Sequence, residues 1–368
     1  MKIIILVMML ILKGNNVYAI DYYELSPELS RIQEVLSKND ISNKIFDVNP
    51  KSLIKDLISG RFKFDLKKFL NSLTKLLLKD ILQNASLLVN LMLLAILCAI
   101  LNNIQNSFCS FNNIAFYVCN VAIISILMKC FNNCVNITKD VVDDIGIFSR
   151  SVIPISTSLM LSSGQVMKNN TLKPFLLYAI SVIVDLIKKV NLPLIYMATI
   201  LEIFNNITDK IQISKLGKLL RNMSNFIIGF ILTIFIGVIT IKGTVANLVD
   251  SITGKTAKYM FGEFIPVVGK YLADVADSVL GSLMLIKNVV GIASVLGIVL
   301  MCIIPIVKLF SIIIILKIVE TTLEPITDKR IVNSVNQVVK AVSAMIGVVF
   351  LLSVVTIFSF AILVIIHK

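Results

Sequence analysis

Charged residues and helix breakers interrupt the apolar sequence between Gly254 and Gly291. The stretch reads GKTAKYMFGEFIPVVGKYLADVADSVLGSLMLIKNVVG and holds Lys255, Lys287 and five further charged residues, together with Pro266. Charges and broken helices are costly in lipid, because hydrocarbon offers no partner to a charge or to a free backbone group. The segment is therefore predicted to line water or to bind a partner, unless it forms a plain surface loop.

Four carboxylates lie in or beside apolar runs, namely Asp185, Glu202, Asp274 and Asp277. Coupled transporters often use an ionisable group inside the membrane, so each of the four is a candidate for that chemistry. Asp274 and Asp277 are three residues apart and share one face of a helix, which makes them the best pair. A solvated helix end is the simpler interpretation of each.

The sequence gives little support for a metal site or a catalytic nucleophile. The six cysteines form no C-x-x-C pair, and Cys130 and Cys134, one helical turn apart, are a weak metal signal. The only histidine is His367, which excludes a histidine-based metal site or a Ser-His-acid triad inside the fold. Gly254-Lys255-Thr256 resembles the end of a phosphate-binding loop, but Val249 stands where its first glycine belongs. We predict no catalytic, cofactor-binding or metal-ligating residue, no cofactor and no enzymatic activity.

The composition is that of a membrane protein. The chain has 368 residues, of which 57% are hydrophobic and 15% charged, with a mean hydropathy of +0.91. A soluble protein carries about a quarter charged residues, and several apolar runs here reach the roughly 20 residues that cross a bilayer. The sequence predicts an all-α, polytopic helical membrane protein. Its net charge of +13 is spread over segment ends, which favours anionic lipid headgroups over nucleic acid as the partner.

The first 84 residues divide into a signal peptide and an amphipathic region. Residues 1–19 have a positive start at Lys2, a short apolar core and a small-residue cleavage site ending at Ala19, although an uncleaved anchor is the alternative. Residues 20–84 are predicted to be an extracytoplasmic amphipathic helical region. Its basic helix over 62–82 fits a membrane surface or a small helical domain that packs on itself. Its lysines would usually mark the cytoplasmic side, which conflicts with a cleaved signal.

Seven or eight transmembrane helices are expected after the signal. The first two, 85–101 and 114–131, form a two-helix membrane hairpin over 85–131. A polar link, 132–150, precedes the short segment 151–164, which suits a re-entrant or interfacial piece. The later spans are 172–190, 192–204, 226–241, 289–304 with a continuation to 319, and 342–366. The sequence leaves open whether the pairs around Pro193 and Pro305 are two spans, a hairpin or one broken helix.

Residues 132–243 and 244–368 have matching features in the same order, which predicts an internal membrane repeat. Pro154 matches Pro266, Pro193 matches Pro305, the tetrad Ile-Thr-Asp-Lys occurs at 207–210 and 326–329, and Gly229 matches Gly347. Chance similarity between apolar sequences is the alternative. With three spans in each copy the repeats would be inverted, and such transporters place their path at broken helices between the halves. The candidate path-lining or partner-binding residues are Pro154, Lys255, Pro266, Gly269, Asp274, Asp277 and Lys287.

A family resemblance lies in the same segments. RSVIPISTSLMLSSG (150–164), NLP (191–193) and KLGKLLRNMSNFIIGFILTIFIGVITIKG (215–243) resemble, in this order, the stage III sporulation protein AE family. AKYMFGEFIPVVGKYLADVADSVLGSLMLIKNVVG (257–291), PIVKLF (305–310) and EPITDKR (324–330) continue the resemblance. It covers nearly the whole chain and is most specific at 257–291.

The resemblance implies a multi-pass protein of the mother-cell membrane that surrounds the forespore in endospore-forming bacteria. It also implies partners, namely the other stage III sporulation A proteins, which include a cytoplasmic secretion-type ATPase (AA), small membrane proteins and ring-forming extracytoplasmic proteins. That complex is expected to act as a channel, secretion or feeding apparatus that keeps the forespore active. No catalytic residue is carried over from the family.

The sequence therefore supports two hypotheses about function, which are of different kinds. The chain is a membrane subunit of the sporulation channel or secretion complex, with energy supplied by a partner because it has no nucleotide site of its own. Alternatively, it is a self-sufficient secondary transporter built on an inverted repeat. An intramembrane aspartyl enzyme would need two facing carboxylates, such as Asp185 with Asp274, and nothing in the sequence favours that pairing.

Overall fold

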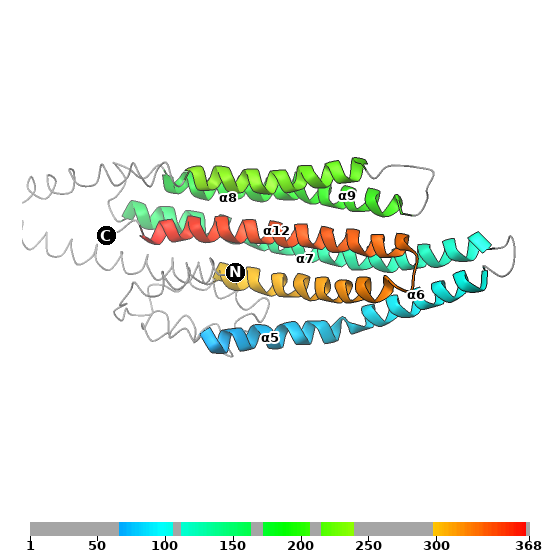
Figure 1. The fold of residues 1–368 in the computed structure, drawn as a ribbon. Helices are drawn as coiled ribbons and strands as arrows, with labels where there is room; N and C mark the ends of the chain where they lie inside the picture. The colour runs from blue at the N-terminus through cyan, green and yellow to red at the C-terminus, as the bar shows by residue number, and fades with distance from the viewer. Residues whose placement is uncertain (1–65, 106–111, 163–171, 207–214, 239–296, 366–368) are drawn as a thin grey trace, which may run out of the picture.

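The computed structural model describes residues 66–105, 112–162, 172–206, 215–238 and 297–365 (Figure 1). Within these ranges the chain is helical apart from short turns, and they contain no strand, so the predicted all-α class is confirmed. The predicted signal peptide 1–19 with Ala19, the part of region 20–84 before Leu66, and the segment 254–291 lie outside the described residues.

Long helices lie side by side and alternate in direction along the chain (Figure 1). Five helices of the described part are long and apolar enough to cross a membrane, by length and composition, which supports a membrane protein. The expected count of seven or eight is not confirmed. The elements are α5 (Leu66–Gln83), α6 (Ala85–Gln105), α7 (Asn112–Ser162), α8 (Leu172–Leu186), the π-helix η2 (Ile187–Asn191), α9 (Leu192–Phe204), helix 215–238, helix 297–323 and α12 (Lys329–Ile365).

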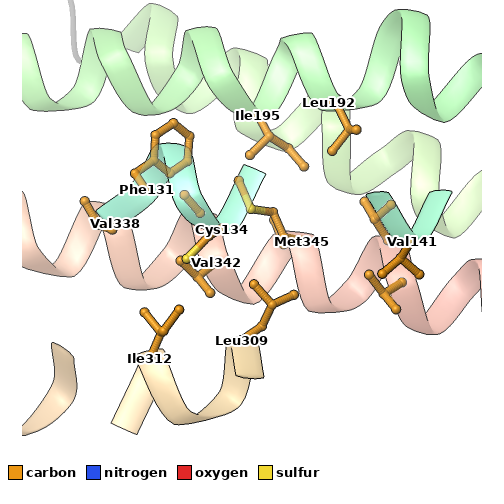
Figure 2. Packing of buried hydrophobic residues seen from close by; sticks show 14 of the residues in the cluster. Phe131, Cys134, Val141, Leu192, Ile195, Leu309, Ile312, Val338, Val342 and Met345 are labelled. Carbon is orange, nitrogen blue, oxygen red and sulfur yellow. The ribbon is translucent and has the colours of Figure 1, made fainter. Parts of the chain in front are cut away.

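Helix α12 is the centre of the bundle. Its buried residues recur every three or four positions, at Val335, Val338, Val342, Met345 and Val349, which is the spacing of one continuous helical face. This face packs against α7, α9 and helix 297–323 (Figure 2). The packing closes the described helices around one apolar core.

Helix α7 differs most from the sequence-based expectation. It runs unbroken for 51 residues, so the predicted polar link 132–150 and the separate re-entrant segment 151–164 are not formed. The polar stretch stays helical because Val142, Ile145 and Phe148 recur at helical spacing and are buried in the core. Pro154 lies within this helix, where a proline removes one backbone hydrogen bond without ending the helix. At 1.5 Å per residue α7 is about 77 Å long, far more than the roughly 45 Å of a whole bilayer, so it projects beyond the membrane.

The segments around Pro193 and Pro305 are each one helix. Helix 297–323 passes through Pro305 without interruption. Residues 172–204 also form one rod, with η2 inserted before Pro193 and right-handed helical backbone angles at both ends of the π turn. The wider turn lets the N–H of Leu192 bond to the carbonyl of Ile187, five residues back, just ahead of the proline. Neither two spans nor a hairpin is found, and the single helix around Pro305 lacks the break that the third arrangement predicted.

Helix α5 packs into the bundle, which neither interpretation of region 20–84 anticipated. It buries Phe69 and Leu73 in the common core and exposes Lys75 and Lys79. A turn at Asn84, whose side-chain amide donates to the carbonyl of Asp80 at 2.8 Å, joins it to α6. Helix α6 then continues in nearly the same direction (Figure 1).

The two hairpins of the predicted repeat run in the same direction. One consists of the rod 172–204 and helix 215–238, and the other of helix 297–323 and α12 (Figure 1). Asn206 Nδ2 donates to Ser334 Oγ at 3.1 Å, so the turn of the first hairpin lies beside that of the second. Gly347 lies against Ile228, the neighbour of its sequence counterpart Gly229. The two described hairpins are therefore related as parallel rather than inverted units.

Candidate functional site

Most of the predicted path-lining residues lie outside the described part of the chain. This applies to Lys255, Pro266, Gly269, Asp274, Asp277 and Lys287, whose assignment stays a prediction. Pro154 is in α7, and so it is not brought into a separate re-entrant segment. Asp185 and Glu202 are described, and their surroundings differ sharply from each other.

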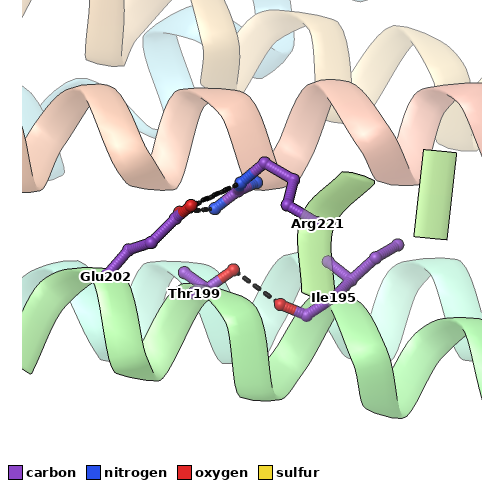
Figure 3. A network of polar contacts seen from close by, with 4 residues as sticks. All are labelled: Ile195, Thr199, Glu202 and Arg221. Atoms are coloured by element: carbon purple, nitrogen blue, oxygen red, sulfur yellow. Dashed lines mark hydrogen bonds and ion pairs between the residues drawn. The ribbon is translucent and has the colours of Figure 1, made fainter. Parts of the chain in front are cut away.

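Glu202 is buried and bound by an arginine of the neighbouring helix. It projects from α9 toward Arg221 of helix 215–238, and only 3% of its side chain is exposed (Figure 3). Arg221 Nε donates to Glu202 Oε1 at 3.2 Å and to Oε2 at 3.0 Å, and Arg221 Nη2 also contacts Oε2. A planar guanidinium that binds both carboxylate oxygens fixes their distance and orientation. The pair therefore locks α9 to helix 215–238.

A glycine allows the two helices to approach at this pair. A Cβ atom on Gly217 would stand 2.7 Å from Glu202 Cγ and 3.2 Å from the backbone oxygen of Ala198. No side chain fits there without separating the helices. One turn earlier in α9, Thr199 Oγ1 donates to the carbonyl of Ile195 at 2.7 Å, so its buried hydroxyl is satisfied within its own helix (Figure 3).

A second polar contact ties the same two helices near the π turn. Asn191 Nδ2 donates to the carbonyl of Ser224 at 2.9 Å, and both residues are fully buried. Asn191 Oδ1 and Ser224 Oγ make no hydrogen bond with protein atoms, and neither does Arg221 Nη1 of the neighbouring pair. Buried hydrogen bonds of this kind set the register of two helices more tightly than apolar packing alone.

Asp185 lies instead on the outer surface of the bundle. Its Oδ2 is 3.0 Å from Lys189 Nζ, and the two side chains are 52% and 74% exposed. Lys188, the residue before Lys189 in η2, pairs with Asp143 of α7. The ion pairs thus follow the line where α7 meets α8 and η2. In the ranges that the structure describes, no three potential metal-ligating side chains gather in one place.

The arrangement assigns Glu202 a structural role. Its carboxylate is a fixed counter-ion of Arg221, whereas a proton-coupling carboxylate must change partners during transport. Sequence reasoning did not identify Arg221 as the partner of Glu202, or Gly217 as the point of close approach. The short link after α9 makes its neighbour antiparallel, but the register that joins Glu202 to Arg221 depends on packing.

Comparison with known proteins gives one family. The model of the family described as stage III sporulation protein AE matches residues 48–367. A curated relative from Bacillus subtilis (strain 168), stage III sporulation protein AE, is 30% identical over 309 residues, which cover 83% of this chain and 77% of the relative. No solved structure matches. Because the family match extends over most of the sequence, the chain belongs to the stage III sporulation protein AE family, and its role lies in sporulation.

Proposed function

We propose that the protein is a membrane subunit of the channel or secretion complex that links mother cell and forespore during sporulation. It resides in the mother-cell membrane around the forespore and works with the other stage III sporulation A proteins, including the ATPase AA and the ring-forming proteins. Family membership and the set of membrane-length helices support this proposal. The chain is not an enzyme in this proposal, and the energy for transport comes from a partner.

The observation that carries the subunit role is the closed core of the bundle. In the described part, α12 is surrounded by apolar side chains, and its buried hydroxyls bond to its own backbone. Ser353, Thr356 and Ser359 each donate to the carbonyl four residues earlier, at 2.7, 2.5 and 2.8 Å. A dry, packed centre offers no route for a polar solute. A conducting path then has to involve surfaces that face other proteins.

The self-sufficient transporter is the less favoured function. Its basis was an inverted repeat, and the two described hairpins run in the same direction. Of its four candidate carboxylates, Glu202 is held by Arg221, and Asp274 and Asp277 lie outside the described residues. Loss of uptake into proteoliposomes on combining Asp274→Asn with Asp277→Asn would restore this alternative.

Co-purification from sporulating cells tests the subunit role. The tagged full-length chain is extracted from membranes in mild detergent, and the eluate is probed for the ATPase AA and the ring-forming proteins. We expect these partners to elute with the chain and to be absent when an unrelated multi-pass protein carries the same tag. Isolation of the chain alone, in a strain where it is fully active, contradicts the proposal.

A further inference from the structure

Six charged side chains gather on the outer surface where α7 meets α8 and η2. We call them the charged seam, which consists of Lys139, Asp143 and Arg150 of α7 with Asp185, Lys188 and Lys189. The pairs Asp143–Lys188 and Asp185–Lys189 join its members, and Arg150 is close enough to Asp185 to interact with it electrostatically. The two helices approach closely in the middle of the seam, where a Cβ on Gly146 would stand 3.0 Å from Val184 Cγ1.

The seam lies at the depth where the neighbouring helices carry no charge. Phe148, between Asp143 and Arg150, reaches Gly297 at the start of helix 297–323, with 4.0 Å between its ring and the Cβ position of the glycine. Farther along that helix, the thiol of Cys302 lies within hydrogen-bonding reach of the side chain of Ser353 of α12. Residues 297–307 and 341–365 contain no charged residue. The seam is therefore level with charge-free stretches of two membrane-length helices.

Helix 215–238 provides a third charge-free surface at this depth. Ile228 lies beside Gly347, and because helix 215–238 and α12 run in the same direction, Ile234 lies level with Ser353. Phe230 and Ile234 are exposed, and no charge occurs in residues 222–238. This side of the bundle suits lipid tails. On the seam side, at the same depth, the side chains of Lys189 and Asp185 are 74% and 52% exposed.

Charged groups at membrane depth do not face hydrocarbon. Each one costs at least about 2.5 kcal/mol there, so such residues point into a protein interior or a water-filled space. The seam points out of the bundle, and the bundle interior is apolar. Water is therefore the medium that suits the seam, and protein has to separate that water from lipid.

Two local features fit a wet surface. The π turn η2 widens the helix at Lys188 and Lys189, and such turns are frequent at functional sites. A groove of about 360 Å³ opens at the end of the seam, and Lys139, Lys188 and Tyr196 line it together with four apolar residues.

We infer that the charged seam is the water-facing wall, at membrane depth, of the path through which the complex passes its cargo. This inference rests on the function proposed above. Asp140 and Asp144 border the seam on α7, so four acidic and four basic residues share this wall. Such a balanced surface passes small hydrated solutes without strong selection by the sign of their charge.

Thiol accessibility tests the inference. Lys189→Cys and Asp185→Cys are compared with Ile234→Cys and Phe230→Cys in the full-length chain, within the complex that is co-purified from sporulating cells and reconstituted into lipid vesicles. Unsubstituted protein, which keeps its natural cysteines, is the blank. Small cationic and anionic methanethiosulfonates are applied, and modification is followed by mass spectrometry. We expect both reagents to modify the seam positions at least about tenfold faster than the other two, because the reacting thiolate needs water.

Two results would overturn the inference. Seam positions that react as slowly as Ile234→Cys would mean that the seam is not in water. Control positions that react as fast as the seam would mean that this layer of the bundle is not in lipid. Fluorescence of a bimane label attached to Ile234→Cys would give the same answer if brominated lipid tails failed to quench it. Either outcome leaves the co-purification result unaffected, so it separates this inference from the proposed function.

Discussion

At the residue scale, the Glu202–Arg221 pair decides how α9 meets helix 215–238. Only 3% of the Glu202 side chain and 11% of the Arg221 side chain are exposed, and three nitrogen–oxygen contacts join them. The free-energy cost of burying either charge in an apolar setting is offset only by its attraction to the opposite charge. The pair therefore specifies the register of the two helices more than it adds net stability.

Removing one partner of this pair is expected to destabilise the folded protein severely. Glu202→Gln leaves the guanidinium of Arg221 buried without its counter-ion, and we expect a loss of about 3 to 5 kcal/mol of folding free energy. The double variant Glu202→Leu with Arg221→Met should be more stable than either single charge removal, because no unpaired charge remains. Thermal unfolding in detergent measures both effects.

The exposed pair Asp185–Lys189 is the matched control for these variants. Its side chains are 52% and 74% exposed, and the two residues are four positions apart. Lys189→Met should cost less than about 1 kcal/mol, since surface pairs contribute little. Equal unfolding temperatures for Glu202→Gln and Lys189→Met would contradict the structural role of Glu202.

Gly217 and Gly229 of the same helix are expected to respond in opposite ways to alanine. At Gly217 the added methyl group meets Glu202 and the backbone of Ala198, so Gly217→Ala should cost about 1 to 3 kcal/mol. At Gly229 nothing lies within 4 Å of the added atom, and Gly229→Ala should gain roughly 0.5 to 1 kcal/mol from its helix propensity. If the unfolding midpoints of the two variants shifted in the same direction, the result would contradict the close approach at Gly217.

At the element scale, apolar runs predicted helices correctly, whereas the polar run in α7 was wrongly predicted to interrupt a helix. The runs 85–101 and 342–366 are largely found as α6 and the second part of α12, because charge-free stretches of this length have few alternatives to a long helix. The continuity of α7 was missed because its polar stretch places Val142, Ile145 and Phe148 inward, and their burial depends on partners far away in sequence. The Glu202–Arg221 register was missed for the same reason.

The parallel direction of the two hairpins can be tested by cross-linking. Asn206 and Ser334 are in hydrogen-bond contact, so the variant with Asn206→Cys and Ser334→Cys should form a linked peptide under a short thiol cross-linker. Asn206→Cys with Ser359→Cys should not, because Ser359 lies 25 residues farther along α12, about 38 Å away. Linkage of the second pair instead of the first, read by mass spectrometry of tryptic peptides, would indicate inverted copies.

At the scale of the whole molecule, the described helices form a closed bundle with differing sides. The core around α12 is dry, one side at membrane depth is apolar, and the other carries the charged seam. A single chain of this kind presents one wall of a conducting path for solutes but does not enclose that path. The protein is therefore expected to conduct only where neighbouring proteins complete the wall.

Solute flux across liposomes tests this account most directly. Vesicles that contain the purified chain alone are compared with vesicles that contain the complex co-purified from sporulating cells, and protein-free vesicles give the baseline. We expect release of a small entrapped polar dye from the vesicles with the complex, and baseline release from those with the chain alone. Release by the chain alone, at the rate of the complex, would contradict the account.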